Sequence, residues 1–273
     1  MRLLNRQVSR PVGLVLAAAP FVVVIAVYMI ASEARLAENA ADKLLPALET
    51  MGRAIQRVAF EPSRRTGEYL LWQDTAASLS RIGIGIGISV TLAIMIGIPL
   101  GLIPMVRTTL GGFVATVSLI PPITILPILF IVAGLGEVSK IALITLGTAP
   151  VMIRSIAGAV EELPRELIVK AQTLGASTWQ VLVRVVLPQV LPKLILAARL
   201  GLVPAWIFLI SAEAIASTEG LGYRIFLVRR YLAMDVILPY VAWITFLAFA
   251  IDRILLWLSH RLFPWAHLGA KAG

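Results

Sequence analysis

Residues 170–188 read KAQTLGASTWQVLVRVVLP, a stretch that is polar at its start, breaks at a glycine and returns to apolar sequence. Just upstream, Pro164 suits the first turn of a helix, and Glu166 precedes Lys170 by four residues, the favourable order for a helical ion pair. Gly175 allows the chain to leave this helix. The helix carries one apolar stripe, formed by Leu163, Leu167, Ala171 and Leu174.

A second helix is expected to begin at Ser177, because Ser177 and Gln180 fit a capping box. Pro188 is expected to end it. The two short helices would meet at a small-residue corner around Gly175 and Ala176. On these residues alone, the corner can either rest on lipid headgroups or insert into a cytoplasmic partner. The second helix is strongly apolar, with Trp179, Leu182, Val183 and Val186.

The composition around this stretch is that of a membrane protein. Of the 273 residues, 59% are hydrophobic and 14% are charged, whereas soluble domains are nearer a quarter charged. The net charge of +9 comes from basic residues that flank apolar blocks, which fits the positive-inside rule and excludes a nucleic-acid surface. There is no cysteine, and His260 and His267 have no carboxylate cluster beside them. We therefore expect no metal site and no catalytic residue.

Six apolar blocks are each long enough to cross a bilayer at 1.5 Å per residue. The sequence therefore predicts an all-α integral membrane protein with six transmembrane helices. Arg154 interrupts the fourth block, and Arg199 lies in the fifth; both fall toward the inner side, where they can snorkel or line a pore. The blocks are residues 12–31, 82–106, 108–136, 141–160, 194–217 and 236–258.

Six spans place both termini on one side of the membrane, and three arginines before the first block indicate the cytoplasm. The first block exceeds the length of a signal-peptide core, so we expect a retained span, with cleavage as the alternative. Residues 32–78 mix acids and bases and are expected to be a water-exposed connection. Part of it can lie along the membrane surface as a helix with its apolar face at Leu48, Met51, Ile55 and Val58. The three arginines are Arg2, Arg6 and Arg10.

Glycine and proline within the blocks indicate a packed bundle, since neighbouring helices must satisfy the freed carbonyls. Gly83 and Gly87 stand four apart, as do Gly97 and Gly101, and both pairs favour close helix packing. The sequence contains no Gly-x4-Gly-Lys-Ser/Thr phosphate loop. If transport is driven by ATP, the ATPase is therefore expected to be another subunit.

The opening stretch resembles the cytoplasmic loop of ABC importer permeases, whose pattern is Glu-Ala-Ala, three residues, Gly, nine residues, Ile-x-Leu-Pro. Gly175 takes the glycine position, and Val185, Val186, Leu187 and Pro188 take the last four. The first triplet departs, because residues 169–171 are Val-Lys-Ala.

The resemblance extends over roughly residues 75–260. IPPITILPILFIVAGLGEVSKIALI, AEAIASTEGLGYRI and SLSRIGIGIGISVTLAIMIGIPLGL are similar to nitrate/sulfonate/taurine-type permeases. It implies a type I ABC importer permease-like bundle in a bacterial inner membrane, with both termini cytoplasmic. It also implies an N-terminal span with a periplasmic connection (1–74), a core permease domain (75–260) with a coupling loop (161–193), and a cytoplasmic tail (261–273).

In that family the loop docks in a groove of an ATPase subunit. The resemblance implies two ATPase subunits that hold ATP and Mg, a second copy of this chain and a periplasmic solute-binding protein; this chain itself is expected to bind no cofactor. The residues expected to couple the chain to the ATPase are Lys170, Ala171, Leu174, Gly175, Ala176, Ser177, Trp179, Leu187 and Pro188.

Five further residues are candidates for the solute path or a gate. Glu213 is an ionisable group inside a span, which points to function, although a hydrogen bond to another helix or a place near the outer edge also explains it. Pro121 and Pro122 can form a simple kink or a bend that lines the pore. Gly220 and Gly222 permit a tight turn on the outer side.

The family resemblance points to a small nitrogen- or sulfur-containing solute. FEPSRRTGEYLLWQDT and RIFLVRRYLAMDVILPY resemble a branch linked to urea or guanidine breakdown. The alternative function is a self-sufficient channel or secondary carrier for a small polar solute. An intramembrane enzyme is disfavoured, because no Ser/His/Asp cluster or paired intramembrane acids stand out.

Overall fold

The computed structural model describes residues 9–40, 42–63 and 67–271, and in these ranges the chain is helical and has no strand. It divides into two compact units, one from Met1–Tyr69 with Val228–Val241 and one from Leu70–Leu227 with Ala242–Gly273. The α-helices are α1 (Arg10–Glu38), α2 (Leu48–Phe60), α3 (Leu70–Leu92), α4 (Ile98–Leu102), α5 (Pro104–Val117), α6 (Pro122–Ala133), α7 (Glu137–Glu161), α8 (Arg165–Thr173), α9 (Thr178–Gln180), α10 (Leu187–Ala216), α11 (Leu221–Arg229) and α12 (Met234–Leu262).

Five helical stretches in the described ranges are long and apolar enough to cross a membrane. A sixth candidate is the pair α5 and α6, whose axes bend by 93° at a short break. The expected all-α bundle with up to six spans is thus confirmed. The five stretches are Pro11–Glu38, Leu70–Leu102, Glu137–Glu161, Thr178–Ala216 and Met234–Leu262.

Two candidate spans begin earlier than predicted, at Leu70 and Thr178 rather than at residues 82 and 194. The expectation that Pro188 ends the second short helix is wrong, because helix continues from Thr178 to Ala216. A π-helical segment, Val181–Val186, precedes α10, and Pro188 occupies its first turn, where a missing N–H leaves no helical hydrogen bond unmade. A second π-helical segment, Ala93–Gly97, precedes Pro99 in the same way.

In the first unit, hydrogen bonds tie the connection after α1 back to that helix. The Tyr28 hydroxyl donates to the Pro46 carbonyl at 2.7 Å, and the Ser32 hydroxyl donates to the Leu45 carbonyl at 2.9 Å. The predicted surface helix exists as α2, and of its predicted apolar face Val58 is buried and Met51 is partly buried within the unit. Small residues allow close packing on the buried face, which holds Ala54, Val58 and Ala59, whereas Leu48 and Ile55 are exposed.

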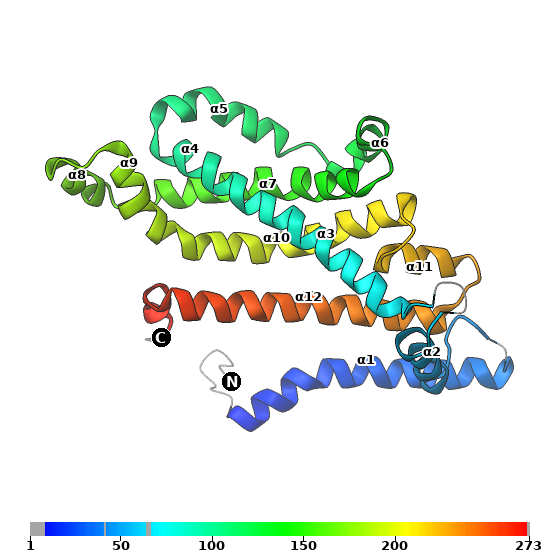
Figure 1. Ribbon diagram of the computed structural model, residues 1–273. Helices are drawn as coiled ribbons and strands as arrows, with labels where there is room; N and C mark the ends of the chain where they lie inside the picture. The colour runs from blue at the N-terminus through cyan, green and yellow to red at the C-terminus, as the bar shows by residue number, and fades with distance from the viewer. Residues whose placement is uncertain (1–8, 41, 64–66, 272–273) are drawn as a thin grey trace. The chain divides into compact units, whose positions relative to one another are not determined.

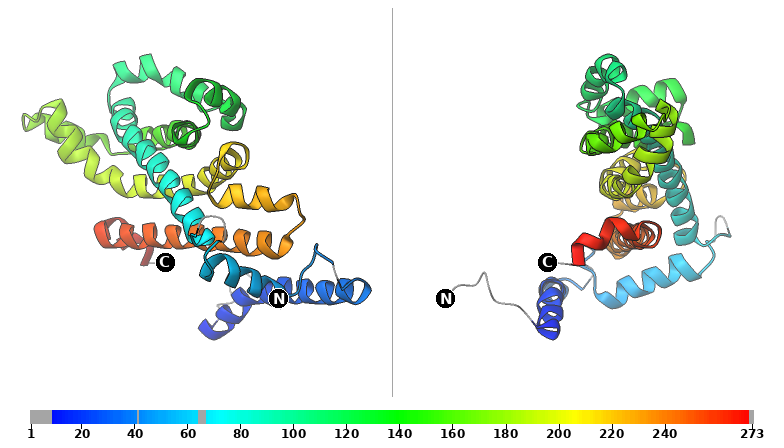
Figure 2. Two further views of the ribbon diagram at one scale, coloured as in Figure 1. Left: turned by 45° about the vertical axis from the view of Figure 1, so that its right-hand side comes forward. Right: turned by 90° about the vertical axis from the view of Figure 1, so that its left-hand side faces the viewer.

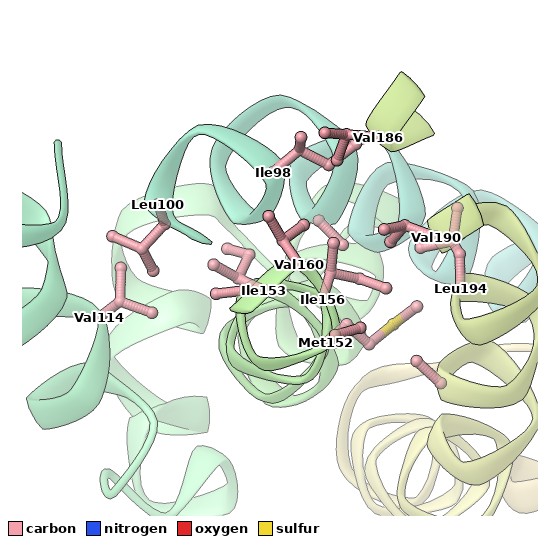
Figure 3. Packing of buried hydrophobic residues seen from close by; sticks show 14 of the residues in the cluster. Ile98, Leu100, Val114, Met152, Ile153, Ile156, Val160, Val186, Val190 and Leu194 are labelled. Atoms are coloured by element: carbon pink, nitrogen blue, oxygen red, sulfur yellow. The ribbon is translucent and has the colours of Figure 1, made fainter. Parts of the chain in front are cut away.

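In the second unit, α7 packs against both α3 and α10 and forms its centre. An apolar cluster joins α7 with α4, with the first half of α10 and with Val114 of α5 (Figure 3). Met152, Ile153, Ile156 and Val160 supply its α7 side. Within a bilayer these side chains stabilise the bundle through van der Waals packing, because lipid tails are as apolar as they are.

Glycine contacts decide which of the predicted close approaches occur. A Cβ built on Gly97 would lie 2.8 Å from the Ile153 carbonyl oxygen, and one on Gly101 would lie 2.6 Å from the Ala157 carbonyl oxygen. This pair therefore packs tightly on α7, as predicted. Gly83 and Gly87 are exposed with no atom within 4 Å of a built Cβ, so this pair makes no close approach within the chain.

Candidate functional site

The segment Arg165–Gln180, here the α8–α9 tip, forms at one end of α7 and α10, and α11 lies at the opposite end (Figure 1). Gly175 has φ +81°, so the chain leaves α8 in the left-handed region that favours glycine. Ser177 and Gln180 then make both halves of the predicted capping box: the Gln180 N–H donates to the Ser177 hydroxyl, and the Ser177 N–H donates to the Gln180 side chain at 2.8 Å. Two local signals therefore build the turn as expected.

The nine residues predicted to couple with an ATPase divide into two groups. Ala171, Ala176 and Leu187 are partly buried and pack against the apolar cluster. Leu174 and Trp179 are instead 88% and 71% exposed. Of the expected apolar stripe, Leu163 and Ala171 pack against the bundle, whereas Leu167 and Leu174 are exposed. Exposed with Leu174 and Trp179 are Lys170, Gly175, Ser177 and Pro188.

At the opposite end lies a cluster of ion pairs and hydrogen bonds, centred on buried side chains, that we call the Arg81 network. Its members are Asp74, Ser78, Arg81, Glu137, Lys140, Glu213, Glu219 and Arg224. They come from α3, α7, α10, α11 and the turn before α11, so the network joins the ends of these helices.

Arg81 is the centre of this network and is 2% exposed. Its guanidinium donates to both carboxylate oxygens of Glu137, at 2.6 and 2.8 Å, and to Glu213 at 2.7 Å. It also donates to the Glu219 carbonyl oxygen at 3.0 Å. Lys140, itself 3% exposed, donates to Glu137 at 2.7 Å. A buried charge needs this degree of pairing, since an unpaired one costs several kcal/mol.

Glu213 has no exposed surface and is bound from three directions. Besides Arg81, the Ser78 hydroxyl donates to it at 2.8 Å and the Gly222 N–H donates at 2.8 Å. These are the interhelical hydrogen bonds that the structural alternative requires. Glu213 ties the end of α10 to α3 and to the start of α11.

Gly220 and Gly222 shape the turn around this carboxylate. Gly220 has φ +121°, and a Cβ built on it would lie 2.5 Å from the Glu213 carboxyl carbon. Its N–H donates to Asp74 at 2.9 Å, and Arg224 donates to the same carboxylate at 2.7 Å. A Cβ on Gly222 would lie 2.9 Å from the Ile210 backbone. Both positions therefore exclude a larger residue.

Arg81 and Asp74 are not among the predicted site residues, because Arg81 immediately precedes the apolar block 82–106 and Asp74 falls within the expected connection 32–78. A usable signal was present, since Asp74, Ser78 and Arg81 lie at i, i+4 and i+7. Polar residues at that spacing share one helix face.

Pro121 and Pro122 lie at the 93° break between α5 and α6 (Figure 2), which exceeds a simple proline kink. Pro122 lines a cleft of about 330 Å³ between this break, α7 and α10. The Arg154 side chain donates to the Ser118 hydroxyl at 2.8 Å, and Ser118 also lines the cleft. Arg199 does not snorkel; it makes two hydrogen bonds to Asp252 of α12, at 2.8 and 3.0 Å.

Residues 85–265 match the family described as binding-protein-dependent transport system inner membrane component. The taurine transport system permease protein TauC of Escherichia coli (strain K12) is 42% identical over 196 residues, 71% of each chain. A Bacillus subtilis (strain 168) protein, SsuC, named as an aliphatic sulfonates transport permease protein, is 29% identical over 69% of this chain and 68% of its own.

Among solved structures, a chain of the inward-facing MetNI methionine ABC transporter superposes with a TM-score of 0.57 at 23% identity. It covers 70% of this chain and 94% of that chain, and the likeness shows the fold. The chain therefore belongs to the binding-protein-dependent transport inner membrane components, as an ABC permease of the nitrate/sulfonate/taurine type.

Proposed function

We propose that this chain is the membrane subunit of an importer whose energy comes from two separate ATPase subunits docked on the α8–α9 tip. The observation that carries the proposal is the exposure of Leu174 and Trp179 at a tip whose inner residues pack firmly on the bundle. Large apolar side chains projecting from a polar corner are typical of anchors that enter a partner's groove.

The α8–α9 tip lies in the cytoplasm in this proposal, and the Arg81 network lies at the periplasmic end. The positive-inside rule supports this orientation through Arg2, Arg6 and Arg10. Arg2 and Arg6 lie outside the described residues, so the support is from sequence. Both termini are then cytoplasmic, and a periplasmic binding protein delivers the solute next to the network.

The transported solute is a small organic sulfonate of the taurine class in this proposal. The 42% identity to a taurine permease and the likeness to a sulfonate permease support this choice. Two copies of the chain form the path, as the family resemblance implies. ATP and Mg are held by the ATPase subunits and not by this chain.

Reconstitution in vesicles tests the proposal. The chain would be incorporated with and without its cognate ATPase, and uptake of labelled taurine, urea and guanidine would be measured with the binding protein outside. Taurine uptake is expected only with both the ATPase and internal ATP. Uptake by this chain alone would show a channel or secondary carrier instead. ATP-dependent uptake of guanidine but not of taurine would show that the chain is an importer subunit for a different solute.

A further inference from the structure

Arg154 is a charged side chain inside a membrane span that faces a neutral partner. It lies on α7 seven residues before Glu161, about 10 Å from that end of the helix. Arg81, Lys140 and Arg199 each face a carboxylate. Among the described residues, by contrast, no acid forms an ion pair with Arg154, which is exposed and donates to the Ser118 hydroxyl. Its charge is therefore available to a ligand.

The direction of the side chain argues against simple snorkelling. A snorkelling arginine extends toward the nearer membrane surface, which for Arg154 is the end of α7 at Glu161. Side chains on a helix tilt toward its N-terminus, and Ser118 lies at the α5–α6 break. All α7 residues of the adjoining cleft except Ser155 precede Arg154, so most of the cleft lies on the Glu137 side of Arg154.

The cleft beside Arg154 has the chemistry of a site for an oxyanion group, such as a sulfonate, carried on a short carbon chain. Its volume of about 330 Å³ lies within the range of small-molecule pockets. Three hydroxyl-bearing residues, Ser118, Thr148 and Ser155, stand among otherwise largely apolar walls. The Arg154 guanidinium, which donates to Ser118 of the cleft wall, suits an oxyanion, because its N–H groups can bind two oxygens at once. The apolar walls include Val117, Ile120, Leu146, Val151, Met152 and Phe208.

We propose that Arg154 and Ser118 bind the anionic headgroup of the transported solute while its carbon chain occupies the cleft. The inference rests on the proposed importer function and narrows it, since a cation such as guanidinium would be repelled at this point. It assigns the solute contact to the α5–α6 break rather than to Glu213, whose carboxylate is fully engaged in the Arg81 network.

The test uses the complete transporter with its ATPase and binding protein in neutral phosphatidylcholine vesicles. We expect Arg154→Gln to lower ATP-driven taurine uptake about tenfold or more, because a hydrogen bond to a charged group is lost. Arg154→Lys keeps the charge and should retain more uptake than Arg154→Gln. ATP hydrolysis stimulated by the loaded binding protein should stay within about twofold of wild type, so that more ATP is used per solute.

Arg53→Gln is the matched control, because it removes one exposed arginine far along the chain from the cleft; its uptake should equal that of wild type. Unchanged taurine uptake in Arg154→Gln would overturn the inference, as would an equal loss of uptake and ATP hydrolysis, which indicates a structural role. An effect seen only when anionic phosphatidylglycerol is added would assign Arg154 to a lipid headgroup. Failure of the wild-type transporter to need ATP would instead overturn the proposed function.

Discussion

The two ends of the second unit differ in how far their side chains find partners within the chain. At the Arg81 network, Asp74, Arg81 and Glu213 have almost no exposed surface and find their charged partners within the same chain. At the α8–α9 tip, Leu174 and Trp179 leave most of their apolar surface uncovered. The network is complete as folded, whereas the tip presents a surface that suits another subunit. Substitutions at the network should therefore affect stability first, and substitutions at the tip should affect assembly first.

The largest expected effect on stability comes from removing the Arg81 side chain. Arg81→Ala leaves Glu137 and Glu213 without their shared cation, and breaking a buried ion pair in this way costs about 3–5 kcal/mol. We expect a large loss of folded protein, measured by thermal unfolding in detergent. Arg81→Lys restores one charge and should recover part of the stability. If Arg81→Ala were as stable as wild type, the network would not stabilise the fold.

One positive-φ glycine from each end allows a direct comparison: Gly220 at the network and Gly175 at the tip. Gly220→Ala adds backbone strain and a clash with Glu213, together about 3 kcal/mol of lost stability. Gly175→Ala adds only strain, about 1–2 kcal/mol, since no atom lies within 4 Å of a built Cβ. Unfolding midpoints of the two variants compare them directly, and equal losses would mean that the close contact at Gly220 is absent.

At the tip, Trp179→Ser should separate assembly from folding. Its unfolding free energy is expected to change by less than about 0.5 kcal/mol, as for exposed sites. Its affinity for the ATPase should fall about thirtyfold, the effect of losing an aromatic anchor worth about 2 kcal/mol. Co-purification and binding titration with the cognate ATPase measure this. Unaltered affinity would place the docking surface elsewhere.

The smallest effect is expected at the capping box. Ser177→Ala removes the acceptor for the Gln180 N–H and should destabilise the start of α9 by about 1 kcal/mol. Faster hydrogen exchange of residues 178–181 would report it, with Ser177→Thr as the conservative control because threonine also caps. Exchange that stays at the wild-type rate would show that the apolar packing alone holds this turn.

The features predicted from sequence are those held within a few residues. The turn at Gly175 and the capping box at Ser177 depend on backbone preferences of near neighbours, and both form as expected. The Arg81 network instead joins Arg81 to Glu137 and Glu213, residues far apart in the chain, and no local rule pairs them. The prediction that a helix ends at Pro188 fails for another reason. The π-helical segment before Pro188 lets the helix continue, and sequence periodicity does not indicate such a segment.

Site-specific crosslinking tests the central claim most directly, because the chain has no cysteine of its own. Leu174→Cys at the tip and Val138→Cys beside the network would each be reacted with the cognate ATPase in assembled transporter; both positions are highly exposed. We expect a crosslink from residue 174 to the ATPase and none from residue 138. A crosslink from residue 138 alone would contradict this expectation, because the ATPase would then sit at the network end.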